Sequence, residues 1–88
     1  MACYIVTFEA IGANADQTIR DRLKTLSGYC PINAHSWAVL TDKTAIELRD
    51  FLSVDLPASR IFVVRSGTLA AWTNAYGEKN NEWLKKNL

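Results

Sequence analysis

The chain has 88 residues, of which 49% are hydrophobic and 22% are charged, and its formal net charge is +1. This balance is typical of a folded domain and excludes a disordered tail. A net charge near zero gives no sign of the basic stripe that nucleic-acid-binding proteins usually carry. The longest apolar stretches are far shorter than the roughly 18 residues that a membrane span needs, and no segment resembles a signal peptide. We therefore expect one domain, residues 1–88, in a cytoplasmic protein without a membrane partner.

The first predicted elements are a strand and a helix. Residues 2–8 form an apolar run rich in β-branched and aromatic side chains, which predicts a buried strand. Asn14 and Gln17 have the spacing of a capping box, and an apolar stripe follows them, so a helix is expected to begin there. Gly28 is a suitable residue to end it.

Two strands and a second helix are predicted in the middle of the chain. Residues 29–32 can form only a short edge strand, because Pro31 lacks the amide hydrogen that a central strand needs. Residues 36–40 predict the next strand. Thr44 and Glu47 form a Thr-x-x-Glu capping box, which is the clearest helix start in the sequence.

The last part of the chain predicts a fourth strand and a C-terminal extension. Residues 60–65 place four consecutive apolar side chains between two arginines, which favours a strand. Residues 66–88 form the extension, in which Asn81 is a suitable N-cap for a short final helix. Trp72 and Trp83 are expected to pack in the core or in a dimer interface.

This order of elements predicts an α+β protein with a ferredoxin-like βαββαβ sandwich. Two helices can cover only one face of a four-stranded sheet, yet the first and fourth strands are apolar on both faces. Tyr4 and Ile5 point to opposite sides of the first strand, as Ile61 and Phe62 do on the fourth. The second face therefore needs a cover, and we expect a homodimer in which the extension contributes to that face or to the interface.

Few side chains point to chemistry. Glu9 ends the first strand, where it is either a solvated carboxylate or, paired across a dimer axis, a ligand for Mg²⁺ or Mn²⁺ in a hydrolytic site. His35 is the only histidine and is expected at the surface. Cys3 and Cys30 fall two strands apart in the expected fold, too far for a disulfide, so they are expected to be small buried side chains.

Four basic residues are candidates for contacts with a nucleic acid. Arg60 and Arg65 flank the fourth strand, and Lys85 and Lys86 lie near the C-terminus. Such side chains can bind phosphates, although strand-end and helix-end charges are more often only solvated. A nucleic acid or a protein is therefore an expected partner besides the second copy.

The sequence also resembles a family of small bacterial proteins that are often labelled SinR-like. That family belongs with the CRISPR-associated spacer-acquisition subunit and the VapD ribonucleases, and the resemblance extends over nearly the whole chain. It implies a ferredoxin-like fold and a face-to-face homodimer. The segments that carry it are 4–9, 36–39, 41–50, 70–72 and 82–85, of which 41–50 is the most specific.

Two functions of different classes are compatible with the sequence, and the near-zero net charge and the absence of an acid–base pair favour the non-enzymatic one. Nuclease members of the wider group carry Asp at the position of Glu9, and the extra methylene of Glu moves the carboxylate by more than an ångström. We therefore expect a non-enzymatic homodimeric binding module for an unknown ligand, with no cofactor. The alternative is a metal-dependent endonuclease, acting on RNA or DNA through Glu9 at the dimer axis with Mg²⁺ or Mn²⁺.

Overall fold

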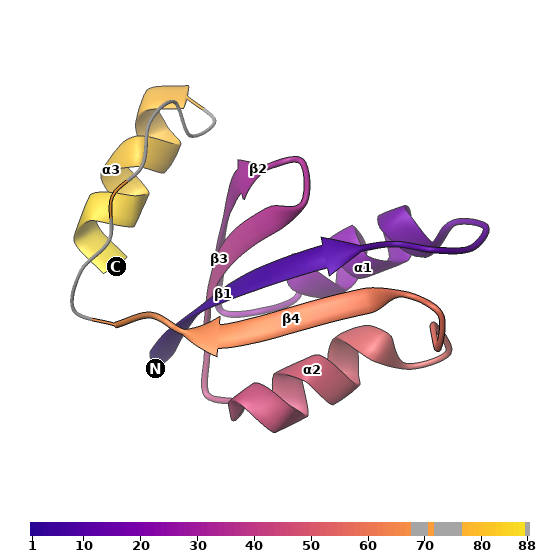
Figure 1. Ribbon diagram of the computed structural model, residues 1–88. Coiled ribbons are helices and arrows are strands. Elements are labelled where there is room, and N and C mark those ends of the chain that lie inside the picture. The colour runs from indigo at the N-terminus through magenta and orange to yellow at the C-terminus, as the bar shows by residue number, and fades with distance from the viewer. Residues whose placement is uncertain (68–70, 72–76, 88) are drawn as a thin grey trace.

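The structure, a computed structural model, describes residues 1–67, 71 and 77–87 (Figure 1). Four strands form one antiparallel sheet in the order β2-β3-β1-β4. The protein is thus a small α+β fold whose sheet is compatible with the predicted ferredoxin-like arrangement, with β2 at an edge as expected. Its elements are β1 (Ala2–Glu9), α1 (Ala15–Leu23), β2 (Gly28–Asn33), β3 (Ser36–Thr41), α2 (Ala45–Ser53), β4 (Arg60–Arg65) and α3 (Gly77–Asn87).

Helices α1 and α2 cover one face of the sheet and enclose the main core with it (Figure 1). Strand side chains alternate between faces, so Tyr4, Val6 and Phe8 of β1 all point toward these helices. Burying each such side chain contributes about 1.5–3 kcal/mol. The helices contribute the fully buried residues Ile19, Leu23, Leu48 and Leu52.

The predicted start of α2 is confirmed. The Thr44 amide donates to Glu47 Oε1 at 2.9 Å, and the Glu47 amide donates to the Thr44 hydroxyl at 3.1 Å. These bonds satisfy two amides that have no partner within the helix. The hydrogen bond from the Thr44 backbone also stabilises the ionised carboxylate, which lowers the pKa of Glu47 below its ordinary 4.5.

The predicted start of α1 is at the right residue, but its capping box is wrong. Asn14 precedes the helix in a left-handed conformation with φ of 61°, and its side chain makes no capping hydrogen bond. Capping by a side chain needs an extended backbone at that residue, which Asn14 does not have. Gln17 donates to Asp21 at 2.7 Å instead of reaching back to Asn14.

Two further helix boundaries differ from the expectation. Helix α1 ends at Leu23, and Gly28 begins β2 opposite Leu40. A Cβ atom on Gly28 would lie 3.0 Å from the Leu40 side chain, so this glycine serves close packing in the sheet and not a helix stop. Helix α3 begins at Gly77 and not near Asn81, whose side chain donates within the helix to the Gly77 carbonyl at 2.7 Å.

Helix α3 packs on the second face of the sheet, against its β2 half (Figure 1). Leu84 is fully buried there with Cys3 and Cys30. The Asn80 side chain donates to the Pro31 carbonyl at 3.0 Å and holds the helix against the edge strand. None of the described helices is long and apolar enough to cross a membrane.

Candidate functional site

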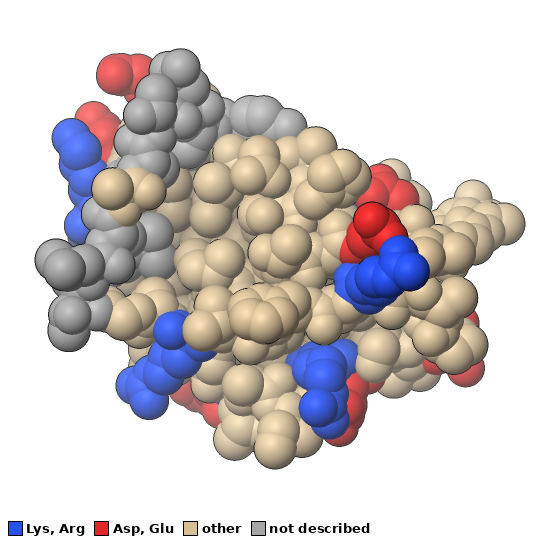
Figure 2. Space-filling model, in the orientation of Figure 1, with Lys and Arg blue, Asp and Glu red and all other residues tan. Residues whose placement is uncertain are grey.

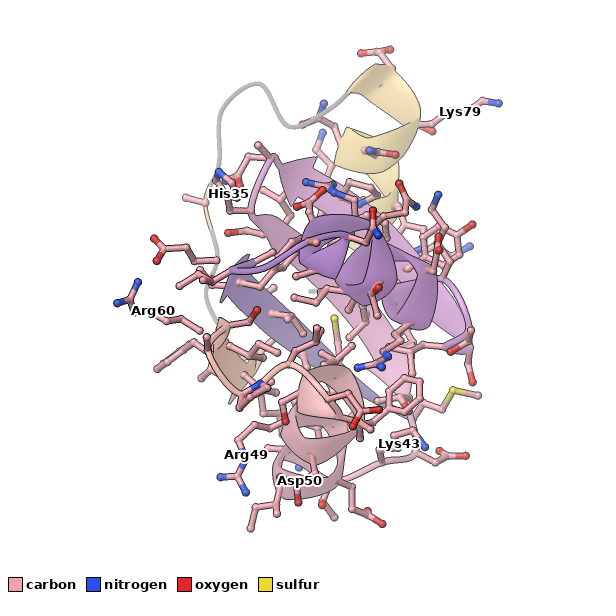
Figure 3. All side chains as sticks on the ribbon, turned by 90° about the vertical axis from the view of Figure 1, so that its right-hand side faces the viewer. His35, Lys43, Arg49, Asp50, Arg60 and Lys79 are labelled. Atoms are coloured by element: carbon pink, nitrogen blue, oxygen red, sulfur yellow. The ribbon has the colours of Figure 1, made fainter. Side chains whose placement is uncertain are left out.

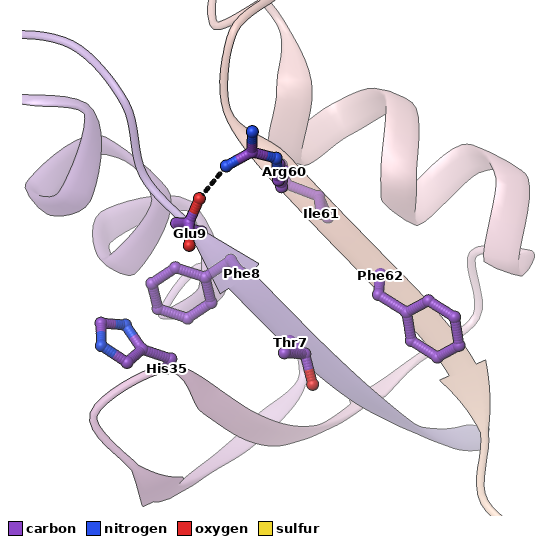
Figure 4. A pocket seen from close by; sticks show the side chains of 7 residues that line it. All are labelled: Thr7, Phe8, Glu9, His35, Arg60, Ile61 and Phe62. Atoms are coloured by element: carbon purple, nitrogen blue, oxygen red, sulfur yellow. Dashed lines mark hydrogen bonds and ion pairs between the residues drawn. The ribbon is translucent and has the colours of Figure 1, made fainter.

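A groove of about 520 Å³ lies where the end of β1 meets the beginning of β4 (Figure 4). The antiparallel register brings these ends together by placing Glu9 opposite Arg60 and Thr7 opposite Phe62. The turn between β2 and β3 closes the groove with His35. The groove is lined by Thr7, Phe8, Glu9, His35, Arg60, Ile61 and Phe62.

Glu9 and Arg60 form an ion pair across the two strands (Figure 4). Both side chains are mostly exposed, with 61% of Glu9 and 74% of Arg60 accessible to solvent. An ion pair in water contributes only about 0–1 kcal/mol, because solvent screens it and two long side chains lose freedom. The pair therefore does little for stability, but it occupies the carboxylate that the nuclease alternative requires.

His35 lies beside this pair because two hydrogen bonds of its own amide and carbonyl hold its turn. Its amide donates to Asn33 Oδ1 at 3.0 Å, and its carbonyl accepts from the Phe8 amide at 2.9 Å. The His35 and Phe8 rings meet edge to face, with centroids 6.4 Å apart (Figure 4). The imidazole thus stands at the rim of the groove near Glu9, exposed as predicted.

The four basic residues predicted to bind a nucleic acid do not converge on one surface. Arg60 and Arg65 lie at opposite ends of β4, and side-chain alternation places them on opposite faces of the sheet. Lys85 and Lys86 lie in the last turn of α3, which packs near β2 at the other side of the sheet. Among these four predicted residues, only Arg60 lines the groove.

An apolar surface adjoins the groove on the part of the second sheet face that α3 leaves uncovered. We call this surface the open face; it consists of Ile5, Thr7, Phe62 and Val64. Phe62 is 63% exposed and Val64 is 45% exposed. Figure 2 shows this side of the molecule, with charged side chains around its margin and an uncharged centre.

The structure describes one of the two tryptophans that were predicted to pack in the core or in a dimer interface. Trp83 lies on α3, where it is partly buried against the cluster formed by Cys3, Cys30 and Leu84 of the same chain. Trp72 lies outside the described residues. An intermolecular role for Trp83 would therefore use the part of its side chain that this cluster leaves exposed.

The two cysteines are buried free thiols, as predicted, and the structure places both in one cluster. Burial raises the pKa of both thiols, and the Ser66 side chain opposes the shift at Cys3 through a hydrogen bond. Both therefore stay protonated and weakly nucleophilic near neutral pH. They contribute to packing under α3 and not to the chemistry of the groove.

The residues of the groove do not fit a resident divalent cation. Mg²⁺ and Mn²⁺ prefer several oxygen ligands, and Glu9 supplies the only carboxylate among the groove residues. Arg60 holds a positive charge against that carboxylate, where a cation would have to displace it. The described residues contain no group of three or more His, Cys, Asp or Glu side chains arranged to hold a metal.

No protein-family model matches the chain, and no curated protein or solved structure is significantly similar to it. What the site can do therefore follows from its own residues. Sequence reasoning identified Glu9 and Arg60 separately, but it missed their pairing and the apolar groove between them. Only the strand register could have revealed this, because 51 residues separate the two.

Proposed function

We propose that this protein is a non-enzymatic binding module that works as a homodimer, closed through its open face. The observation that carries the proposal is the exposure of the apolar side chains Phe62 and Val64, which neighbour each other on one face of the sheet. Contiguous exposed apolar surface is uncommon on monomers and marks interaction sites. A second copy presents the same surface, so a two-fold axis through it would bury both patches at once.

The proposal includes the finer identity of the fold and its location. A ferredoxin-like sandwich with a C-terminal extension would have this strand order. The proposed membership of the SinR-like family rests on the resemblance of segments 4–9, 36–39, 41–50, 70–72 and 82–85. A cytoplasmic location suits two thiols that lie unpaired in one cluster, since reducing compartments preserve free cysteines.

The alternative is a metal-dependent endonuclease acting on RNA or DNA. The proximity of His35 to Glu9 in one groove favours it. Against it stand the ion pair that engages Glu9 and the lack of further carboxylates in the groove, so we derive no catalytic step from this site. A nucleic acid would also meet little positive charge here, because Arg60 is the only Lys or Arg among the groove residues and the Glu9 carboxylate lies against it.

Native mass spectrometry of freshly purified protein tests the proposal, because it reports stoichiometry and any co-purifying ligand together. We expect a homodimer at micromolar concentration. A spectrum that contains only the monomer at that concentration would contradict the proposal.

A further inference from the structure

The outer edge of β4 presents backbone groups to solvent in a regular pattern. In an antiparallel pair, only alternate residues of a strand bond to a given neighbour. The Ser66 amide donates to the Cys3 carbonyl of β1 at 2.9 Å, which fixes the alternation. Arg60, Phe62 and Val64 therefore bond toward β1. The amides and carbonyls that point outward belong to Ile61, Val63 and Arg65, and none of the described strands pairs with this edge.

A second groove runs beside this edge, between β4 and α2. It has a volume of about 220 Å³ and is lined by Ala45, Ile46, Arg49 and Val63. Ile46 is 63% exposed, so its side chain contributes apolar surface that the fold itself does not bury. A strand edge with a neighbouring groove is the arrangement by which several domains bind an extended peptide, whose alternate side chains enter the groove. Here Ala45, Ile46 and Val63 form the apolar part of the lining, and Arg49 forms the polar part.

The charges along this edge favour an acidic partner. Arg49 lies in the groove, and Arg60 and Arg65 lie at the two ends of β4. Figure 3 shows Arg49 and Arg60 projecting to the same side of the molecule, far from Lys79. The pairs Arg49–Asp50 and Arg60–Glu9 are exposed and therefore weak, and Arg65 forms no ion pair with any described residue.

The same charges disfavour a second copy of the strand. Pairing of β4 with another β4 would bring a second Arg60 and a second Arg65 to one seam, and like charges across strands are destabilising. A peptide with acidic ends and an apolar middle would meet the arginines with opposite charge and the groove with apolar side chains.

We propose that the edge of β4 and its groove bind an extended segment of another protein, apolar in its middle and acidic at both ends. The segment would run antiparallel to β4 and exchange backbone hydrogen bonds with Ile61, Val63 and Arg65. This inference names a partner for the binding module proposed above and rests on that proposal. It uses the edge of the sheet, whereas the dimer uses the open face.

A fluorescein-labelled, C-terminally amidated peptide, Asp-Thr-Val-Thr-Val-Asp, tests the inference. When the peptide runs antiparallel to β4, its first Asp lies opposite Arg65 and its last Asp lies opposite Arg60. Its two valines then lie opposite Val63 and Ile61, on the sheet face that adjoins the groove. Fluorescence anisotropy should show saturable binding that weakens as salt is raised. The same peptide with lysine at both ends should bind at least about tenfold more weakly.

Backbone methylation separates strand pairing from general adhesion. In this register, the amides of the two valines point toward β4, while the amides of the two threonines point away. We expect N-methylation of the valines to abolish binding and N-methylation of the threonines to leave most of it. Equal effects of the two modifications, or absence of binding by the parent peptide, would overturn the inference.

Charge reversal on the protein gives an independent test. The double substitution Arg49→Glu and Arg65→Glu should reverse the preference between the acidic and the lysine-ended peptides, while the control Lys79→Glu on α3 should leave it unchanged. Light scattering on the same samples separates the two proposals. If the protein is a dimer that does not bind the peptide, the peptide inference is wrong and the open-face dimer stands. If the protein is a monomer that binds the peptide, the open-face dimer is wrong and the peptide inference stands. Dissociation of the dimer by the double substitution would place the second copy on the edge and overturn the inference.

Discussion

Substitution of Phe62 by serine should dissociate the homodimer while leaving the fold intact. Phe62 belongs to the open face and is 63% exposed, so its side chain makes few contacts within one chain. The free energy of unfolding of the monomer should change by less than about 1 kcal/mol, the scale of strand-propensity and surface effects.

The effect on the dimer follows from the surface that a partner would cover. A Phe residue presents about 200 Å², of which the exposed 63% is about 125 Å². At about 25 cal/mol per Å², complete burial contributes about 3 kcal/mol per chain and about 6 kcal/mol per dimer. The dissociation constant should therefore rise by up to about 10⁴-fold.

Sedimentation equilibrium over a dilution series measures this constant, and circular dichroism monitors the fold. Ile46→Ser provides a matched control, because Ile46 is also 63% exposed but lies on α2, away from the open face. We expect this control to remain dimeric. If Phe62→Ser stays as dimeric as the control, the open face is not the interface.

Four further predictions concern the helix start, its pH dependence, the α3 contact and the groove. Thr44→Ala should lower the free energy of unfolding by about 1 kcal/mol in urea denaturation, and an unchanged value would mean that the cap does not act in solution. Because the pKa of Glu47 lies below 4.5 in the folded chain, the stabilisation by its carboxylate is complete above that pH and is lost as the pH falls through the folded value. Acidification from about pH 7 to about pH 3 should thus destabilise the wild type more than Glu47→Gln, and parallel losses would refute this. Leu84→Ala should cost about 2–5 kcal/mol and accelerate labelling of the Cys30 thiol, whereas an unchanged labelling rate would show that α3 does not protect it. Wild type should cut neither RNA nor DNA with Mg²⁺ or Mn²⁺ beyond the level of Glu9→Ala, and metal-dependent cleavage that this variant lacks would favour the endonuclease.

The sequence predicted those structural features that depend on residues close together in the chain. The reciprocal bonds of Thr44 and Glu47 involve residues three apart, so residue types and spacing suffice to identify them. The same reasoning failed at Asn14 because this residue has a left-handed backbone, and its side chain makes no capping hydrogen bond. At Gly28 the decisive contact is with Leu40 on the next strand, which no local pattern reveals.

The candidate site depended on information that the sequence pattern lacks. Residues 60–65 predicted that Ile61 and Phe62 would point to opposite faces of the sheet, and the structure packs Ile61 against the helix-side core and leaves Phe62 exposed. The meeting of Glu9, Arg60 and His35 in one groove requires the register of three strands, because these residues are far apart in the chain. Helix α3 covers the β2 half of the second sheet face, so the open face comprises only the part formed by β1 and β4.

Hydroxyl-radical footprinting of the wild type most directly tests whether a second copy covers the open face. The oxidation rate of Phe62, normalised to its intrinsic reactivity, is compared with that of Ile46, which has the same 63% exposure in the single chain. We predict that Phe62 is several-fold more protected than Ile46 at micromolar concentration and that dilution below the dissociation constant removes the difference. Equal normalised rates at every concentration would show that the open face meets only water.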